Sequence, residues 1–104
     1  MKTITNLSDI KDIEVQFDST TNPLFKYLSG KHGVISYDMH VIIFVGVMHQ
    51  MHTSYIKKLE IKNNLFTFTT RNSTYKFKSV FDYADTVIEI DQSKLEQQLK
   101  QAGY

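Results

Sequence analysis

Histidine is the residue type in this sequence best suited to chemistry, because imidazole binds metals and transfers protons near neutral pH. His49 and His52 are separated by two residues, and His32 and His40 precede them. A zinc site needs several such ligands that converge on one point. The His-x-x-His spacing places both rings on one side of a helix but on opposite faces of a strand, and this stretch has the pattern of a strand end or loop. We therefore predict ordinary loop histidines, with no metal and no other cofactor.

Nucleophilic and acid–base catalysis have little support in the sequence. The chain has no cysteine, which excludes thiolate nucleophiles, thiolate zinc sites and disulfides. It contains no glycine-rich phosphate loop, no His-Glu-x-x-His and no nucleophile elbow. Asp82, Asp85, Glu89 and Asp91 could together hold a divalent ion, but a solvated acidic surface is the better interpretation. We predict that the protein is not an enzyme.

Positive charge is concentrated in one part of the chain. The whole sequence has a net charge of +1, whereas segment 57–78 has +5, because six basic side chains stand against one acid, Glu60. Segments 1–18 and 79–104 have net charges of −2 and −3. The candidate binding residues are the six basic ones: Lys57, Lys58, Lys62, Arg71, Lys76 and Lys78. This asymmetry is the strongest physical indication of a binding surface.

The basic segment has a structural interpretation and a functional one. Lysines on exposed strands protect a sheet from edge-to-edge aggregation, and they can also follow a phosphate backbone or an acidic protein. Within each expected strand the lysines alternate with apolar residues and so share a face, whereas Tyr75 and Phe77 fall on the opposite one. A base-stacking platform needs aromatic rings beside the lysines, so the pattern argues against that form of nucleic-acid binding. Arg71, at a predicted turn, could anchor an interface.

The elements that position these residues are mainly strands. Alternation of apolar and polar residues predicts an early strand and then five more: 13–17, 34–48, 55–61, 65–70, 74–77 and 86–90. Segment 34–48 is apolar on both faces, which predicts a strand covered on both sides. Asn63-Asn64 predicts a tight hairpin turn, since asparagine tolerates the positive φ that such turns require.

Two helices are expected beside these strands. Asn22 and Pro23 suit the start of a helix over 23–29, and Gly30 suits its end. A capping-box spacing and an apolar stripe predict a second helix over 93–103. The predicted fold class is therefore α+β: an antiparallel meander of about five strands with a short helix in the N-terminal half and a C-terminal helix, forming one domain over residues 1–104. The sequence leaves open whether the meander is an open sheet or closes into a small bent barrel.

Composition and the N-terminal segment favour the cytoplasm. The first residues lack the basic start and apolar run of a signal peptide. The longest apolar stretch, 41–48, is far shorter than the roughly 20 residues of a membrane span. Absence of cysteine means that the chain gains nothing from an oxidising compartment. We expect a cytoplasmic protein without membrane contact.

Segments 52–56 (HTSYI) and 68–77 (FTTRNSTYKF) resemble a pattern in short proteins of bacteriophages and prophages of low-GC Gram-positive bacteria. In that pattern a Thr-Ser-x-Ile/Val strand precedes a hairpin ending in Thr-x-Asn-Ser-x-Tyr. Abundant Lys, Ile, Asn and Thr, with no Cys or Trp, also suit an AT-rich genome. The resemblance implies a small phage accessory protein that binds and blocks a host macromolecule; inhibitors of CRISPR nucleases are one such group.

These observations give two functional hypotheses. The first is a non-enzymatic protein-interaction module, encoded by a phage or mobile element, that binds and inhibits a host protein or protein–nucleic-acid complex, as an anti-CRISPR protein does. The alternative is a small nucleic-acid-binding or regulatory module that uses the basic hairpin 57–78.

Overall fold

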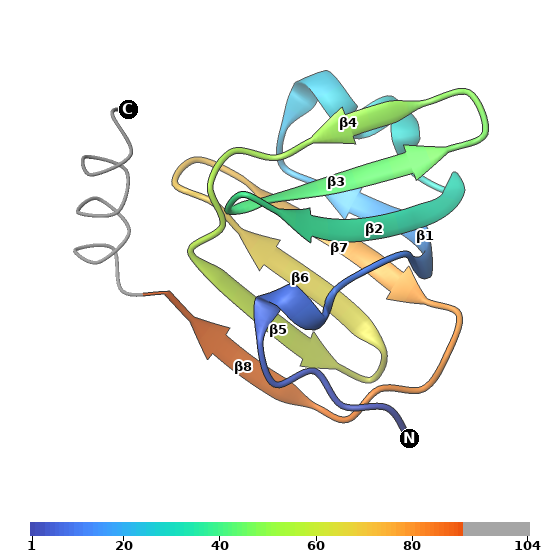
Figure 1. Cartoon of the computed structure of the whole chain (residues 1–104). Helices are drawn as coiled ribbons and strands as arrows, with labels where there is room; N and C mark the ends of the chain where they lie inside the picture. Colours follow the sequence, from blue (N-terminus) through green and yellow to red (C-terminus); the bar gives the residue numbers. More distant parts are fainter. Residues whose placement is uncertain (91–104) are drawn as a thin grey trace.

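The computed structural model describes residues 1–90, which form one antiparallel sheet of eight strands and two short 3₁₀ segments (Figure 1). The strands are β1 (Ile13–Thr20), β2 (His32–Asp38), β3 (Val41–Gly46), β4 (Gln50–His52), β5 (Lys58–Lys62), β6 (Leu65–Thr69), β7 (Thr74–Ser79) and β8 (Thr86–Glu89). The 3₁₀ segments are η1 (Leu7–Asp9) and η2 (Pro23–Leu28). The strand order is β4-β3-β2-β1-β7-β6-β5-β8, so β1 joins two runs of sequential hairpins, β2–β4 and β5–β7, and β8 pairs with β5.

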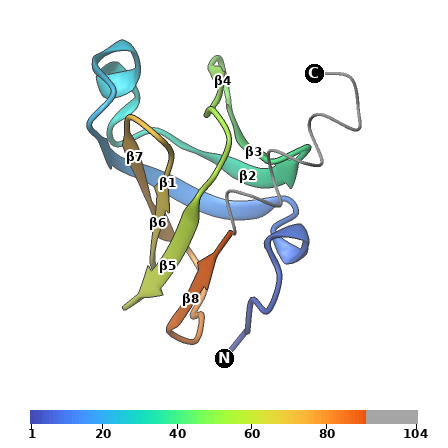
Figure 2. The same cartoon turned by 90° about the vertical axis from the view of Figure 1, so that its left-hand side faces the viewer.

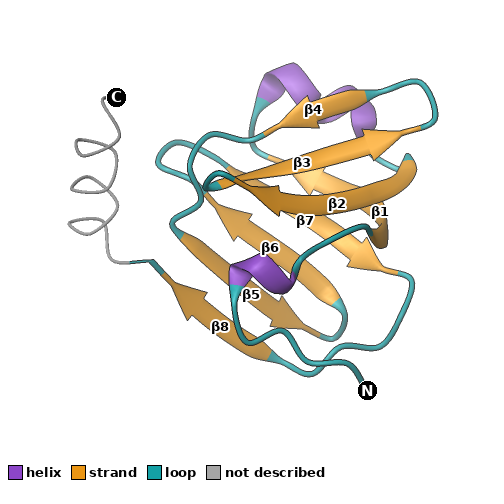
Figure 3. Cartoon of the chain, viewed as in Figure 1, coloured by secondary structure: helices purple, strands orange, loops and turns teal. Residues whose placement is uncertain are grey.

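The predicted α+β class is wrong, because the described chain is nearly all antiparallel sheet, and its helical segments, purple in Figure 3, are the short 3₁₀ segments η1 and η2. The helix expected over 23–29 is the 3₁₀ segment η2. Its start follows the prediction, since the side chain of Asn22 accepts a 3.0 Å hydrogen bond from the backbone of Leu24. The segment is held short because the N–H of Gly30 already bonds to the carbonyl of Phe17 on β1, at 2.7 Å. The helix expected over 93–103 lies outside the described residues.

The single strand predicted over 34–48 is also wrong, because the chain reverses within it. β2 and β3 pair along their whole length, from Asp38 opposite Val41 to Gly33 opposite Gly46. The reversal takes place at Met39 and His40, which both adopt positive φ, at 47° and 71°. Two consecutive residues with positive φ are the mark of a type I′ hairpin turn. The predicted count of about five meander strands was too low partly for this reason.

The sheet bends sharply at β1, so that its two halves enclose a common core (Figure 2). β3 and β7 are three places apart in the strand order, which would be about 14 Å in a flat sheet. Instead, the ring centroids of Phe44 on β3 and Phe77 on β7 are 5.7 Å apart. Phe17 on β1 lies 5.5 Å from Phe44 and 4.9 Å from Phe77. These three fully buried rings join the two halves.

The bend coincides with an irregularity in β1. Its register against β7 shifts between Phe17 and Ser19, which leaves Asp18 as an extra, exposed residue. Such a bulge increases local twist and bends the strand. The sheet stays open in the described residues, with β4 and β8 at its two ends. The question of barrel or open sheet is thus answered in favour of an open, folded sheet.

Segment 53–56 connects the two halves on the core side. Thr53 is buried, and its backbone N–H donates to the carbonyl of Ile42 at 3.0 Å, while its hydroxyl accepts from the N–H of Ile42, also at 3.0 Å. Ile56 is fully buried, and its N–H donates to the carbonyl of His40 at 2.8 Å. This part of the sequence resemblance therefore has a structural role in closing the core.

Candidate functional site

Four of the six basic candidates project from one surface, the outer face of the β5–β6–β7 half. They are Lys58 and Lys62 of β5 and Lys76 and Lys78 of β7, here called the lysine face. The residues that alternate with them are buried in the core: Leu59, Ile61, Tyr75 and Phe77. Period-two alternation in the sequence predicted this division, and the strand register places both lysine pairs on the same side of the sheet.

A shallow groove runs along β6 between the lysines. Leu65 stands opposite Lys62 of β5 on one side and opposite Lys78 of β7 on the other. The outward side chains of β6, such as Leu65 and Thr67, are uncharged and shorter than the lysines, so they form a floor between a β5 wall with Lys62 and Glu60 and a β7 wall with Lys76 and Lys78. The hollow has a volume of about 430 Å³. We call it the β6 groove.

Acidic side chains interrupt the positive charge of this surface. Glu60 lies two residues before Lys62 on β5, and it stands across β6 from Lys76. Asp18, at the β1 bulge, also lines the β6 groove. Lys58 lies 3.9 Å from the carboxylate of Glu89 on β8, an exposed ion pair of little energetic weight. The surface therefore has mixed charge with an excess of lysines, and it is no uniform phosphate-binding stripe.

The other two basic candidates lie apart from the lysine face. Arg71 is exposed in the turn between β6 and β7, held by a hydrogen bond from the N–H of Thr70 to the carbonyl of Ser73, at 2.9 Å. Lys57 precedes β5, where its N–H donates to Thr69 and its carbonyl accepts from Ile90. Because it continues the ladder of β5 and alternates with Lys58, it does not share the outer face.

The histidines are dispersed over several elements. The ring of His49 packs edge-on against Tyr27 of η2, with centroids 5.8 Å apart. His40, in the β2–β3 turn, has its Nδ1 3.2 Å from the hydroxyl of Tyr37, a hydroxyl whose pKa is raised by burial. Among residues 1–90, no three histidine or acidic side chains are grouped as a metal site would need.

Two of the acidic candidates have a structural role. The carboxylate of Asp85 accepts a 3.1 Å hydrogen bond from the backbone N–H of Asn63, and that of Asp82 accepts a 2.9 Å bond from the side chain of Asn64. Both bonds hold the β5–β6 turn against the segment that leads into β8. They explain the two aspartates without a bound ion.

A second surface was missed by the sequence analysis. The outer face of the β1–β2–β3 part carries exposed apolar side chains, including Val45, Val47 and Val80. Val45 and Val47 had been assigned to a strand covered on both sides, but only the inner face of β3 is covered in the described chain. The glycines Gly33 and Gly46 were no signal for this surface, since a Cβ on either would point to the inner face, toward the buried Phe44.

Comparison of the chain with known protein families, curated proteins and solved structures found no match. No helix within residues 1–90 has the length and apolar character that crossing a bilayer requires. The resemblance to phage proteins remains a prediction, and what the chain binds has to be inferred from its own surfaces.

Proposed function

We propose that this protein is a non-enzymatic interaction module that binds an acidic segment of a host macromolecule in the β6 groove and thereby inhibits it. The observation that carries the proposal is the pair of lysine-bearing strands on either side of an uncharged floor. An extended segment along this floor would place alternate carboxylates toward the lysines of each wall. Charge-assisted hydrogen bonds from ammonium groups to carboxylates are stronger than neutral ones.

An acidic protein fits the surface better than a nucleic acid does. A phosphate backbone carries uniform negative charge, and along the groove it would meet the carboxylates of Glu60 and Asp18. Bases could not stack beside the lysines, because Tyr75 and Phe77 are buried on the other face. A protein segment can place neutral or basic side chains opposite the two acids.

The sequence resemblance to short phage and prophage proteins supports the biological setting of the proposal. It favours a mobile-element protein that works in the host cytoplasm, with a defence complex such as a CRISPR nuclease as its target. The basic groove would then engage an acidic region of the target's protein component.

The test is a charge reversal in the groove with a matched control. Lys62→Glu/Lys78→Glu replaces the two lysines that face each other across Leu65, whereas Lys11→Glu/Lys26→Glu makes the same change of net charge at exposed sites elsewhere. The probes are a labelled glutamate-rich peptide and a labelled DNA duplex, followed by affinity capture from nuclease-treated lysate of a low-GC Gram-positive host. We expect the groove variant to weaken peptide binding at least tenfold, chiefly through a slower on-rate. The control should stay within about twofold of the parent protein.

Melting temperatures of both variants should match that of the parent, since exposed substitutions usually change stability by less than about 0.5 kcal/mol. Equal loss of peptide binding in both variants would mean that only net charge matters, and the groove would not be the site. Tighter binding of the duplex than of the peptide, with a steep loss of affinity in salt, would favour the nucleic-acid alternative instead.

A further inference from the structure

The outer face of β3 is apolar and uncovered in the described chain, and Val34 of β2 adjoins it. Val34 stands opposite Val45, which is 44% exposed although its strand is paired on both sides. Val47 follows β3 and is 98% exposed, and Val80, beyond the end of β7, is 57% exposed. Single exposed apolar residues are common on proteins, but a group on one sheet face marks a contact surface.

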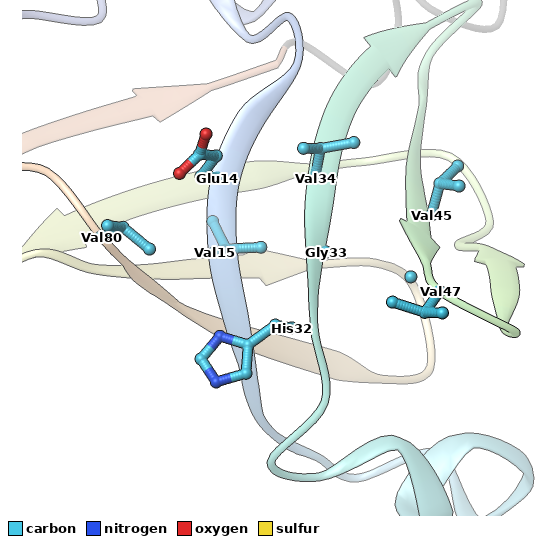
Figure 4. A pocket seen from close by; sticks show the side chains of 9 residues that line it. Glu14, Val15, His32, Gly33, Val34, Val45, Val47 and Val80 are labelled. Carbon is cyan, nitrogen blue, oxygen red and sulfur yellow. The ribbon is translucent and has the colours of Figure 1, made fainter.

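These side chains surround a hollow of about 430 Å³ (Figure 4). Its floor is the bare backbone of the Gly33–Gly46 pair and the neighbouring β1. Gly33 is required beneath the hollow, because a Cβ there would point to the core side, where it would meet the carbonyl oxygen of Val45 and come within 2.8 Å of the Phe44 ring. Val47 and Val80 stand on opposite sides of the hollow (Figure 4).

The surface combines a projecting side chain with a hollow. A prominent side chain, Val47, stands beside a cavity that is large enough to receive a valine. In a two-fold dimer, residue i of one copy contacts residue j of the other, and j contacts i in return. The Val47 of each copy can therefore enter the hollow of the other copy.

The charges around the hollow are also compatible with a second copy. Glu14 and His32 both line it, so each copy offers a carboxylate and an imidazole to its partner. The lysine face on the other half of the sheet has excess positive charge and would repel the lysine face of a second copy. Pairing through the edge strands is less favourable, since β4 has three residues and β8 has four.

We infer that the protein forms a two-fold dimer through the outer face of β1–β3, with Val47 of each copy in the hollow above the Gly33–Gly46 pair of the other. Three strands at about 4.8 Å spacing and about 20 Å length give a face of roughly 300 Å² in plan. A standard stable interface uses about 800 Å² on each partner. The dimer should therefore be reversible and should depend on concentration in the micromolar range.

The test is sedimentation equilibrium of the full chain over a concentration series, with matched lysine substitutions. Val47→Lys adds a positive charge at the proposed contact. The control, Val87→Lys, adds the same charge at a valine of β8 that is 57% exposed and lies on the other half of the sheet. We expect the parent and Val87→Lys to have the same dissociation constant. Val47→Lys should raise that constant at least tenfold, because each copy of a two-fold dimer places the added charge in the interface.

Val80→Lys is a second variant of the same kind, at a site on the far side of the hollow with the same 57% exposure as Val87. It should also weaken the dimer while leaving the melting temperature unchanged at low concentration. A parent chain that stays monomeric at several hundred micromolar would overturn the inference. A dimer that survives both Val47→Lys and Val80→Lys would show that copies associate through another surface.

Discussion

Asp9 shows how a single exposed side chain organises the start of the fold. One carboxylate oxygen accepts hydrogen bonds from the backbone N–H of Asn6 at 3.0 Å, and from the N–H and the hydroxyl of Thr5 at 3.0 and 2.9 Å. These bonds complete a capping box for η1, which places the buried Leu7 against the core. Hydrogen bonds from Asn6 and then from Thr5 favour the ionised carboxylate and lower the pKa of Asp9 below its ordinary value.

The lowered pKa of Asp9 predicts a pH-dependent contribution to stability. Because the folded-state pKa lies below the unfolded value of 3.8, the contribution is present above pH 3.8 and is lost as the pH falls through the folded-state pKa. Asp9→Asn should therefore lower the melting temperature modestly at neutral pH, and the difference from the parent should shrink in acid. Thermal unfolding followed by circular dichroism from pH 7 down to pH 2 measures this. A difference that stays constant over that range would contradict the assignment.

At the residue scale, the sequence predicted the face of the sheet on which each side chain lies. It did not predict which residues of different strands lie close together. Alternation correctly separated the outward lysines from the inward Tyr75 and Phe77. It could not place Glu60 across β6 from Lys76, because that relation depends on the register between strands. Nor could it show that Asp82 and Asp85 bond to the β5–β6 turn, since about 20 residues separate the partners along the chain.

At the scale of elements, turn chemistry decided which strands were predictable. Asn63 and Asn64 have positive φ, 51° and 66°, as their residue type indicated. Met39 and His40 form an equivalent turn, although methionine does not favour positive φ. The chain reversal there was hidden because the apolar pattern continues from β2 into β3. The hairpin forms because its strands pack into the core, and this packing outweighs an unfavourable turn.

This account of the β2–β3 turn predicts a stabilising substitution. Met39 is 68% exposed and has φ 47°, so its side chain contributes little to packing while its backbone lies in a disfavoured region. Met39→Asn should raise the free energy of unfolding by about 0.5–1 kcal/mol, because asparagine adopts positive φ more readily. Met39→Ala is the matched control, since alanine lacks this preference and should give no gain. Urea denaturation of the three proteins measures the difference, and equal gains in both variants would refute the role of φ.

At the scale of the whole molecule, the fold depends on pairing between segments that are distant in sequence. β1 pairs with β7 across some 60 residues, and this pairing turns two meanders into one sheet. No local pattern specifies it, which is why a single meander was expected. The same pairing places a basic outer face on one half of the sheet and, on the other half, an outer face whose β3 part is apolar. A dimer through the apolar half would present two β6 grooves, and an acidic partner with two suitable segments would gain avidity.

The Phe17–Phe44–Phe77 contact predicts that the two halves unfold as one unit. Phe44 belongs to β3, yet its ring packs against Phe77 of β7 at 5.7 Å between centroids and tilts by 33° to it. Phe44→Leu leaves a cavity between the halves and should lower the free energy of unfolding by about 1–2 kcal/mol, less than the 3–5 kcal/mol typical of truncation to alanine.

Because the cavity borders both halves, amide hydrogen exchange should accelerate in β6 and β7 by a factor similar to that in β2 and β3, about five- to thirtyfold. Leu24→Ala, at a site that is 73% exposed on η2, is the control and should leave exchange unchanged in all four strands. If Phe44→Leu accelerated exchange only in β2 and β3, the halves would unfold independently, and the shared aromatic contact would not be what stabilises the folded sheet.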